Sequence, residues 1–343
     1  MGQTPMLDIA EKYLIFLGGA ESADMTKTGR GIAFWAPERC VGQYGIGSGA
    51  GDIGLAPMGF DEAYAAGART LVVGVTGIGG TLHESWIEHL VAALHAGLDI
   101  AAGLHGKLNA HPRLVEVASA LGRKLVDVRV PPPDIKVGTG HRRTGRRVLM
   151  VGTDCALGKK YSALALHQGL LKAGAKASFR ATGQTGIFIA GEGMPMDSTV
   201  ADFATGAAEQ LSPDNDDDHW DVIEGQGSLF HPGFAPVSLG LLLGSQPDAL
   251  VICHQAGRTH VNGYPHVALP SLSECAELNL RMARMTNPDV RVAGISLNTR
   301  TLSDDEAKLA LSEAEAELGV PAIDPIRFGT DRLVTVIMDW EQA

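Results

Sequence analysis

The hydrophobic residues of this chain occur in short runs, and patterns with helical spacing separate the runs. In the first part of the chain the runs cover residues 12–20, 69–80 and 98–105. A helical pattern lies between the last two runs, and its apolar positions are Trp86, Leu90, Val91 and Leu94. Gly97 follows as a natural helix end. This alternation of strand, helix and strand predicts a parallel, doubly wound sheet.

The same alternation starts again after residue 146. The expected strands cover residues 147–152, 175–181, 220–225, 248–254, 290–298 and 332–338. The helix between the last two strands is well marked, because Ser303 and Glu306 have the spacing of a capping box. Gly319 is expected to end that helix, and Pro321 lies just beyond it.

A break in the pattern separates these two parts. Three consecutive prolines at 131–133 precede a heptad at 141–147 that contains four arginines. We expect an α/β domain over residues 1–140, a basic linker with a solvated face over 141–147, and a second α/β domain over 148–343.

Composition narrows the class of protein. The chain has 343 residues, of which 45% are hydrophobic and 20% charged, and this suits two globular domains. Its net charge of −11 argues against a broad nucleic-acid surface. The four cysteines form no zinc motif, and no leader or apolar run of membrane length is apparent. We expect a cytoplasmic protein with neither nucleic acid nor membrane as a partner.

The strongest chemical signal is a glycine-rich loop between a strand and a helix. Gly152 and Gly158 enclose this loop, and Lys159 opens the helix. A phosphate cradle needs glycines that let backbone N–H groups face inward, a helix N-terminus behind them and a lysine that reaches the phosphates. The segment therefore predicts a P-loop, with an ordinary β–α turn as the alternative.

This loop departs from the usual pattern GxxxxGK[ST] in two ways. Its first glycine stands one position early, and Lys160 stands where Ser or Thr normally ligates Mg²⁺. A lysine cannot ligate the metal, but it neutralises phosphate as a point charge. Lys159 and Lys160 together suit a nucleotide diphosphate bound with little or no metal. Tyr161 or Ser162 could still supply a hydroxyl through a register slip.

The loop sequence GTDCALGK resembles the GTDTxxGKT loop of dethiobiotin synthetase and its relatives. The resemblance extends to WDVIEGQGS at 220–228, where the glutamate that matches Glu224 helps to hold magnesium in those enzymes. Arg180 stands near the position of their substrate-binding Lys-Pro pair. An ATP- and magnesium-dependent ligase or kinase is therefore one alternative function.

Over nearly its whole length the chain resembles P-loop proteins long labelled as a domain of unknown function, whose characterised members are D-glutamate N-acetyltransferases. The segments that carry this resemblance are GVTGIGG, AAGLHGKL, GTDCALGKK, ATGQTG, EGQGSLFHP and HQAGRTH. The resemblance implies an α/β fold with an N-terminal Rossmann-like domain and a C-terminal P-loop NTPase-like domain built on a parallel sheet. It also implies acetyl-CoA as co-substrate, with no metal expected. The implied CoA-binding residues are Gly152, Thr153, Asp154, Cys155, Gly158, Lys159, Lys160 and Tyr161.

A second group of polar residues lies at 253–266, after an apolar strand. Acetyl transfer to an amine needs a base with a pKa near neutrality, and histidine or a carboxylate can serve. The candidate bases are His254, His260 and Glu224. A glutamate substrate also needs cations for its carboxylates, and arginine binds these in a bidentate way. The candidate carboxylate binders are Arg180 and Arg258. Polar packing in a loop is the alternative for each histidine.

Three further features carry less weight. The GxGxxG pattern at 49–54 is discounted, because no clear strand precedes it and Pro57 follows it. Residues 74–80 have the strand–loop–helix context of an anion site, with a structural turn as the preferred interpretation. Cys155 could carry an acyl group at a helix N-terminus, but a small loop residue is the preferred interpretation.

These observations lead to one main hypothesis. The protein is expected to be an N-acetyltransferase that moves an acetyl group from acetyl-CoA to an acidic amino acid, D-glutamate by resemblance, as D-amino acid catabolism requires. Besides the ligase or kinase, a non-catalytic nucleotide-binding regulator is an alternative. The expected partners are the small-molecule substrate and further copies of the chain in a homo-oligomer.

Overall fold

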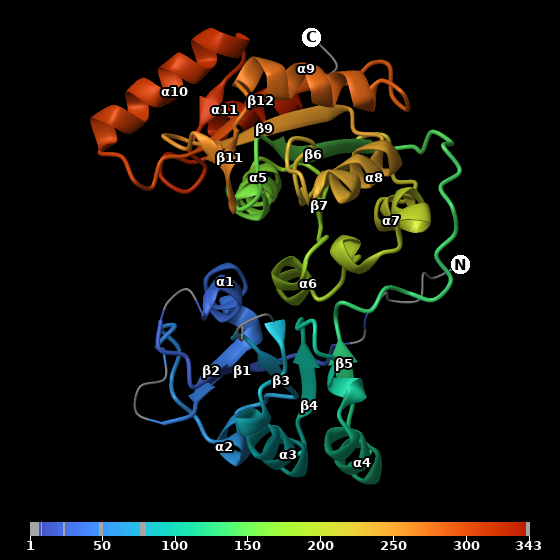
Figure 1. Cartoon of the computed structure of the whole chain (residues 1–343), viewed down its shortest axis with the longest axis vertical. Coiled ribbons are helices and arrows are strands. Elements are labelled where there is room, and N and C mark those ends of the chain that lie inside the picture. Colours follow the sequence, from blue (N-terminus) through green and yellow to red (C-terminus); the bar gives the residue numbers. More distant parts are fainter. Residues whose placement is uncertain (1–6, 8, 23–24, 48–50, 76–79, 341–343) are drawn as a thin grey trace. The chain divides into compact units, whose positions relative to one another are not determined.

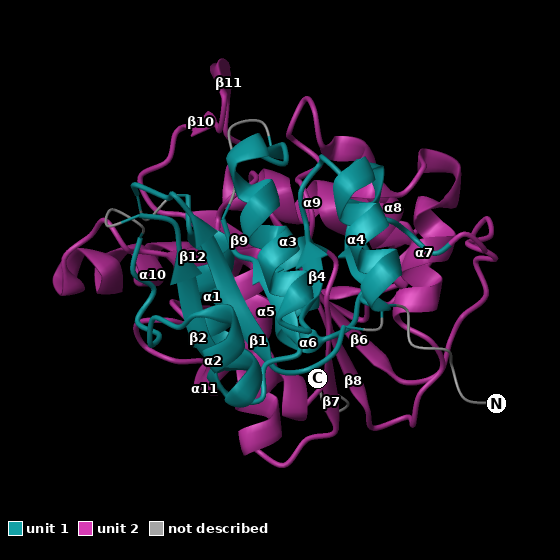
Figure 2. Cartoon of the chain, turned by 90° about the horizontal axis from the view of Figure 1, so that it is seen from below, with its two compact units in different colours: residues 1–132, 183–195 teal, residues 133–182, 196–343 magenta. Residues whose placement is uncertain are grey.

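The structure is a computed structural model that describes residues 7, 9–22, 25–47, 51–75 and 80–340. The chain forms two compact units, which Figure 2 colours separately. The first unit comprises residues 1–132 and 183–195, and the second comprises residues 133–182 and 196–343. The return of residues 183–195 to the first unit was not predicted, and the domain boundaries expected from the sequence stay a prediction.

The first unit contains a five-stranded sheet with the order β2-β1-β3-β4-β5, in which every pair is parallel (Figure 1). Its strands are β1 (Tyr13–Gly18), β2 (Cys40–Gly45), β3 (Thr70–Val73), β4 (Asp99–Ala102) and β5 (Leu125–Asp127). Its helices are α1 (Lys27–Trp35), α2 (Phe60–Ala65), α3 (Ile87–His95), α4 (Pro112–Leu121) and α6 (Gln184–Ala190). The parallel sheet predicted for this part of the chain is confirmed.

Helices pack on both faces of this sheet. On one face, the predicted apolar positions of α3 are buried against Leu14 and Phe16 of β1. On the other face, α1 approaches so closely that a side-chain carbon added to Gly29 would lie 2.9 Å from Ile15. Helix α6 packs beside α1, where the hydroxyl groups of Thr28 and Thr185 lie 3.3 Å apart. Residues 183–195 thus complete the packing of a unit to which they are distant in sequence.

The second unit contains a six-stranded parallel sheet with the order β13-β12-β9-β6-β8-β7. Its strands are β6 (Arg146–Gly152), β7 (Ala177–Arg180), β8 (Trp220–Ile223), β9 (Ala249–Gln255), β12 (Arg291–Asn298) and β13 (Ala322–Ile323). Its helices are α5 (Lys159–Lys172), α7 (Ala204–Leu211), α8 (Ala235–Ser245), α9 (Leu272–Ala283), α10 (Asp304–Leu318) and α11 (Asp331–Met338). A short antiparallel hairpin, β10 (His260–Val261) and β11 (Tyr264–Ala268), follows β9.

Most of the expected elements of the second unit are present. Helix α10 begins after Ser303, whose side chain forms the predicted capping box with Glu306, and it ends at the left-handed Gly319. The strand expected at 332–338 is wrong, because these residues form helix α11. Its buried residues are Leu333, Val334 and Ile337, a spacing that gives one helical face. Strands β2, β5, β10, β11 and β13 were not predicted.

The basic heptad at 141–147 also differs from the solvated linker that the sequence predicts. Arg146 and Arg147 begin strand β6, and Arg147 is only 1% exposed. Its guanidinium donates to the Ser212 hydroxyl and to backbone carbonyls. The solvated face expected here is therefore wrong for Arg147, because five donors in one guanidinium can cap many carbonyls in the interior.

Two sequence interpretations lie partly outside the described residues. These concern the glycine-rich stretches at 47–54 and 74–80. Among the helices that the structure describes, none is long and apolar enough to cross a membrane. The parallel order of the second sheet brings the carboxyl ends of β6, β8, β9 and β12 to one edge, where open α/β sheets bind their ligands.

Candidate functional site

The predicted P-loop connects strand β6 to helix α5. Its backbone turns through a left-handed residue at Ala156, with φ of 53°, and again at Gly158, with φ of 113°. A side-chain carbon added to Gly158 would meet nothing within 4 Å, so the loop opens at this position. The first N–H groups of α5 lie directly behind and have no partner within the helix. This is the arrangement that binds anions at helix N-termini.

A buried ion pair fixes the shape of the loop. Asp154 is fully buried, and its carboxylate accepts hydrogen bonds from the Arg258 guanidinium at 2.9 Å and from the backbone N–H of Asn262 at 2.8 Å. Arg258 also donates to the carbonyls of Cys155 at 2.8 Å and Ala156 at 3.4 Å. Because a trans peptide unit places its N–H opposite its carbonyl, the N–H groups that follow these two carbonyls point away from Arg258.

Two lysines begin helix α5. Lys159 is 6% exposed, and its ammonium donates to the carbonyl of Asp154 at 2.6 Å. The ammonium of Lys160 lies 4.8 Å from the ring centre of Tyr161, and it makes no hydrogen bond to another residue that the structure describes. Burial lowers the pKa of both lysines, and the charge of Glu224 opposes this for Lys160. An anion bound in the loop would offset the free-energy cost of burying both positive charges.

Ser162, one of the two residues whose hydroxyl could replace the missing magnesium ligand, already uses its hydroxyl within the protein. Ser162 lies 2.7 Å from the hydroxyl of Ser296 and donates to the carbonyl of Gly158 at 3.2 Å. Both serines are buried. The register slip considered for Ser162 therefore has no support in its hydrogen bonds.

Two of the three candidate bases lie at the carboxyl edge of the sheet. Glu224 directly follows β8 and is 5% exposed, and its carboxylate accepts a hydrogen bond from the backbone N–H of Thr182 at 2.9 Å. His254 lies near the end of β9, where its Nδ1 atom is 2.9 Å from the Thr153 hydroxyl of the P-loop. Burial lowers the pKa of His254, and the charge of Arg258 lowers it further. His254 is therefore a neutral imidazole at pH 7.

The third candidate base is in a different environment. His260 is exposed in strand β10, and its Nδ1 atom lies 2.9 Å from the hydroxyl of Thr259. Its side chain forms no hydrogen bond or ion pair with a P-loop residue that the structure describes, although the backbone N–H of Asn262 in the same hairpin donates to Asp154. Of the two candidate histidines, His254 is the one whose side chain contacts the P-loop, through the hydroxyl of Thr153.

The two arginines expected to bind substrate carboxylates already bind carboxylates of the protein. Arg180, at the end of β7, donates to Asp221 at 2.8 Å. Asp221 is buried, and it also accepts a hydrogen bond from Ser212 at 2.6 Å. Arg258 likewise forms an ion pair with Asp154. A role of either arginine in substrate binding stays a prediction, and it requires an existing ion pair to open or to be shared.

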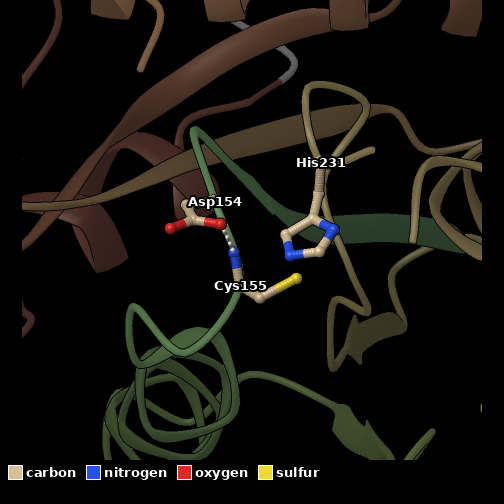
Figure 3. A group of neighbouring side chains, drawn as sticks. All are labelled: Asp154, Cys155 and His231. Atoms are coloured by element: carbon tan, nitrogen blue, oxygen red, sulfur yellow. Dashed lines mark hydrogen bonds between the residues drawn. The ribbon is translucent and has the colours of Figure 1, made fainter. Parts of the chain in front are cut away.

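A further histidine lies beside the P-loop without having been assigned a role from the sequence. His231 is 2% exposed, and it approaches Asp154 and Cys155 closely (Figure 3). Its Nδ1 atom accepts a hydrogen bond from the backbone N–H of Gly233 at 3.1 Å, so a neutral ring carries its proton on Nε2. The only sequence signal for this contact is the Phe-His-Pro turn that follows β8.

This cluster of Asp154, Cys155 and His231 has the residue types of a metal site but suits a metal poorly. The Asp154 carboxylate is already neutralised by Arg258, and the protonated Nε2 of His231 has no lone pair to offer. Burial raises the pKa of the Cys155 thiol, with the Lys159 charge opposing. Cys155 is therefore a protonated thiol, and this favours its interpretation as a small loop residue over an acyl carrier.

Comparisons with known families agree with the two-part architecture. A P-loop domain of unknown function, the C-terminal domain of DUF1611, matches residues 135–334. A Rossmann-like domain, the N-terminal domain of DUF1611, matches residues 56–131. The predicted combination of a Rossmann-like and a P-loop domain is thus confirmed.

Individual relatives match almost the entire chain. A protein named D-glutamate N-acetyltransferase from Tritonibacter scottomollicae is 47% identical over 96% of this chain and 99% of its own length. Another protein of that name, from a Pseudoalteromonas species, is 43% identical over the same shares. The crystal structure of a DUF1611 family protein from Anabaena variabilis superimposes with a TM-score of 0.84 at 35% identity, and it covers 96% of this chain and 100% of that one.

The ion pair between Asp154 and Arg258 can be tested by a double-mutant cycle. Arg258→Gln should lower the free energy of unfolding by about 3–5 kcal/mol, because it leaves a buried carboxylate without its cation. The double variant Asp154→Asn/Arg258→Gln should lose less than the sum of the two single losses. Urea unfolding measures all three variants, and Arg281→Gln on the exposed surface of α9 is the charge-matched control. Strictly additive losses would contradict a direct interaction.

Proposed function

This chain belongs to the DUF1611 family and is an acyltransferase, and we propose that it transfers the acetyl group of acetyl-CoA to the amine of D-glutamate. The observation that carries the proposal is the P-loop with two partly or fully buried lysines, in which the Ser162 hydroxyl is already hydrogen-bonded within the protein. The named relatives at 43–47% identity support the acceptor and the reaction.

The diphosphate of CoA fits the chemistry of this loop. It carries its charge on oxygens that accept hydrogen bonds from backbone N–H groups and lysine. Lys159 and Lys160 supply two positive charges where a metal-dependent P-loop supplies one lysine and a metal ligand. The charge of the diphosphate can thus be balanced by the chain itself.

The reaction needs a proton acceptor but no redox partner. The amine nitrogen of glutamate attacks the thioester carbonyl, a carbon–nitrogen bond forms, and the carbon–sulfur bond breaks to release the CoA thiolate. The ammonium proton must leave before or during the attack, and a base of near-neutral pKa accepts it best. His254 is our first candidate because it is neutral and adjoins Thr153 of the P-loop. Glu224 is the carboxylate alternative.

The ATP-dependent ligase or kinase has less support. Glu224 occupies the position that resembles the magnesium-binding glutamate of dethiobiotin synthetase, but its neighbour in the loop is the cation Lys160. A positive charge next to a magnesium site disfavours the metal. A non-catalytic regulator would share the phosphate cradle, so only turnover separates it from an enzyme.

A direct assay tests the proposal. Purified protein is mixed with acetyl-CoA and D-glutamate in EDTA, and N-acetylglutamate and free CoA are measured by mass spectrometry and thiol titration. We expect equal amounts of the two products, with L-glutamate as the stereochemical comparison. Hydrolysis of acetyl-CoA without N-acetylglutamate, or turnover only with ATP and magnesium, would reject the proposal.

The contribution of the P-loop lysine can be measured by binding. Lys159→Ala should weaken acetyl-CoA binding about tenfold or more, because a charge-assisted hydrogen bond contributes about 1.5–3 kcal/mol. Lys172→Ala, at the exposed end of the same helix, is the matched control and should keep the affinity of the unchanged protein. Titration calorimetry gives both values. Equal affinities of the two variants would mean that the loop does not hold the phosphates.

The base can be identified from rates and their pH dependence. His254→Ala should lower kcat by about 100-fold or more while acetyl-CoA affinity persists. Because burial lowers the pKa of His254, the imidazole becomes protonated only below its usual range near pH 6.5, and the acid limb of kcat should lie there. Glu224→Gln and His260→Ala are measured alongside. A large loss confined to either of these two would assign the base to that residue and not to His254.

A further inference from the structure

A cavity of about 450 Å³ lies beside the P-loop within the second unit. Leu157, Gly158 and Tyr161 of the loop and helix α5 form one side. The end of β12 and residues 324–327 after β13 form the other side. This volume is in the range of small-molecule sites, and the cavity begins at the glycine that ends the phosphate cradle. A ligand whose diphosphate lies on the loop can extend directly into it.

Part of the cavity lining is apolar and suits a partly apolar group. Leu157 and Leu297 are almost fully buried, and Pro325 and Ile326 complete the apolar lining. Ile326 is 59% exposed and lies at the open part of this lining. A purine ring would cover this exposed surface and remove it from water.

The polar side chains that line the cavity differ in whether their hydrogen-bonding groups are already used within the protein. The Asp324 carboxylate accepts hydrogen bonds from Thr299 and from the backbone N–H groups of Ile326 and Arg327. Arg327 in turn donates to carbonyls at 299 and 302 and pairs with Asp304. These two side chains therefore build the wall of the cavity and hold its loops together.

Arg300 is different from Arg327. It lines the same cavity and is exposed, and its guanidinium has neither a hydrogen bond nor an ion pair with any residue that the structure describes. Its backbone is held, because its N–H donates to Asn298 at 3.3 Å, and Asn298 also binds the carbonyl of Leu157 in the P-loop. A cation that pairs with no carboxylate in the described part of the chain thus lies next to the phosphate cradle and at the rim of a cavity.

We propose that this cavity binds the adenosine end of CoA and that Arg300 binds its ribose 3′-phosphate. The proposal rests on acetyl-CoA being the acetyl donor. CoA carries a phosphate on the ribose besides its diphosphate, whereas ADP and ATP do not, and a guanidinium binds such a group with paired hydrogen bonds. Arg300 then makes the site selective for CoA over nucleotides that share its adenine and diphosphate.

The test compares two donors that differ only in the 3′-phosphate. Affinities for acetyl-CoA and acetyl-3′-dephospho-CoA are measured by titration calorimetry in the unchanged protein, in Arg300→Gln and in the surface control Arg281→Gln. We expect the unchanged protein and the control to prefer acetyl-CoA at least tenfold. Arg300→Gln should lose this preference through weaker acetyl-CoA binding, with the dephospho donor unaffected. Arg300→Lys should restore part of the preference, because the charge remains.

The outcomes separate this proposal from the proposed function. Equal affinity for the two donors in the unchanged protein, or equal loss for both donors in Arg300→Gln, would overturn the role of Arg300 while N-acetylation of D-glutamate stands. Failure of acetyl-CoA to bind the unchanged protein would overturn both. Adenosine 3′-phosphate 5′-diphosphate, which differs from ADP only in the 3′-phosphate, should also displace acetyl-CoA more strongly than ADP does, and the reverse order would place the 3′-phosphate outside the reach of Arg300.

Discussion

The buried ion pair between Asp154 and Arg258 is the constraint on which the rest of the site depends. It joins the P-loop after β6 to the segment after β9, and through Asn262 it joins the loop to the β10–β11 hairpin. Removing both charges from water is costly, so the pair is favourable only because additional hydrogen bonds satisfy both groups. Here the guanidinium and the carboxylate each have such partners.

The same pair affects the chemistry on both sides of the loop. By binding the carbonyls of Cys155 and Ala156, Arg258 turns the following N–H groups away from itself. Burial lowers the pKa of His254 and the charge of Arg258 lowers it further, so both favour the neutral form of this candidate base. The lowered pKa values of Lys159 and Lys160 mean that their positive charges are costly without an anion, so ligand binding and folding stability are linked.

Local sequence patterns predicted the parts of this structure that local interactions decide. The glycine loop, the capping box of α10 and the buried face of α3 follow from backbone conformation and side-chain period, and all three are present. Helix α11 was mistaken for a strand because its β-branched residues favour strands, although their burial follows a helical period.

The sequence alone suggests the same role, binding of a substrate carboxylate, for both Arg180 and Arg258. Their partners, Asp221 and Asp154, lie 41 and 104 positions away in the chain, and only the folded chain brings them together.

If lysines and not a metal balance the charge of a diphosphate in this P-loop, acetyl-CoA binding does not depend on magnesium. Calorimetric titration of acetyl-CoA in EDTA and in excess magnesium, beside titration of ATP with magnesium, measures this dependence. We expect the same acetyl-CoA affinity with and without magnesium, and weaker binding of magnesium ATP. Acetyl-CoA binding that requires magnesium, or tighter binding of magnesium ATP, would contradict this expectation.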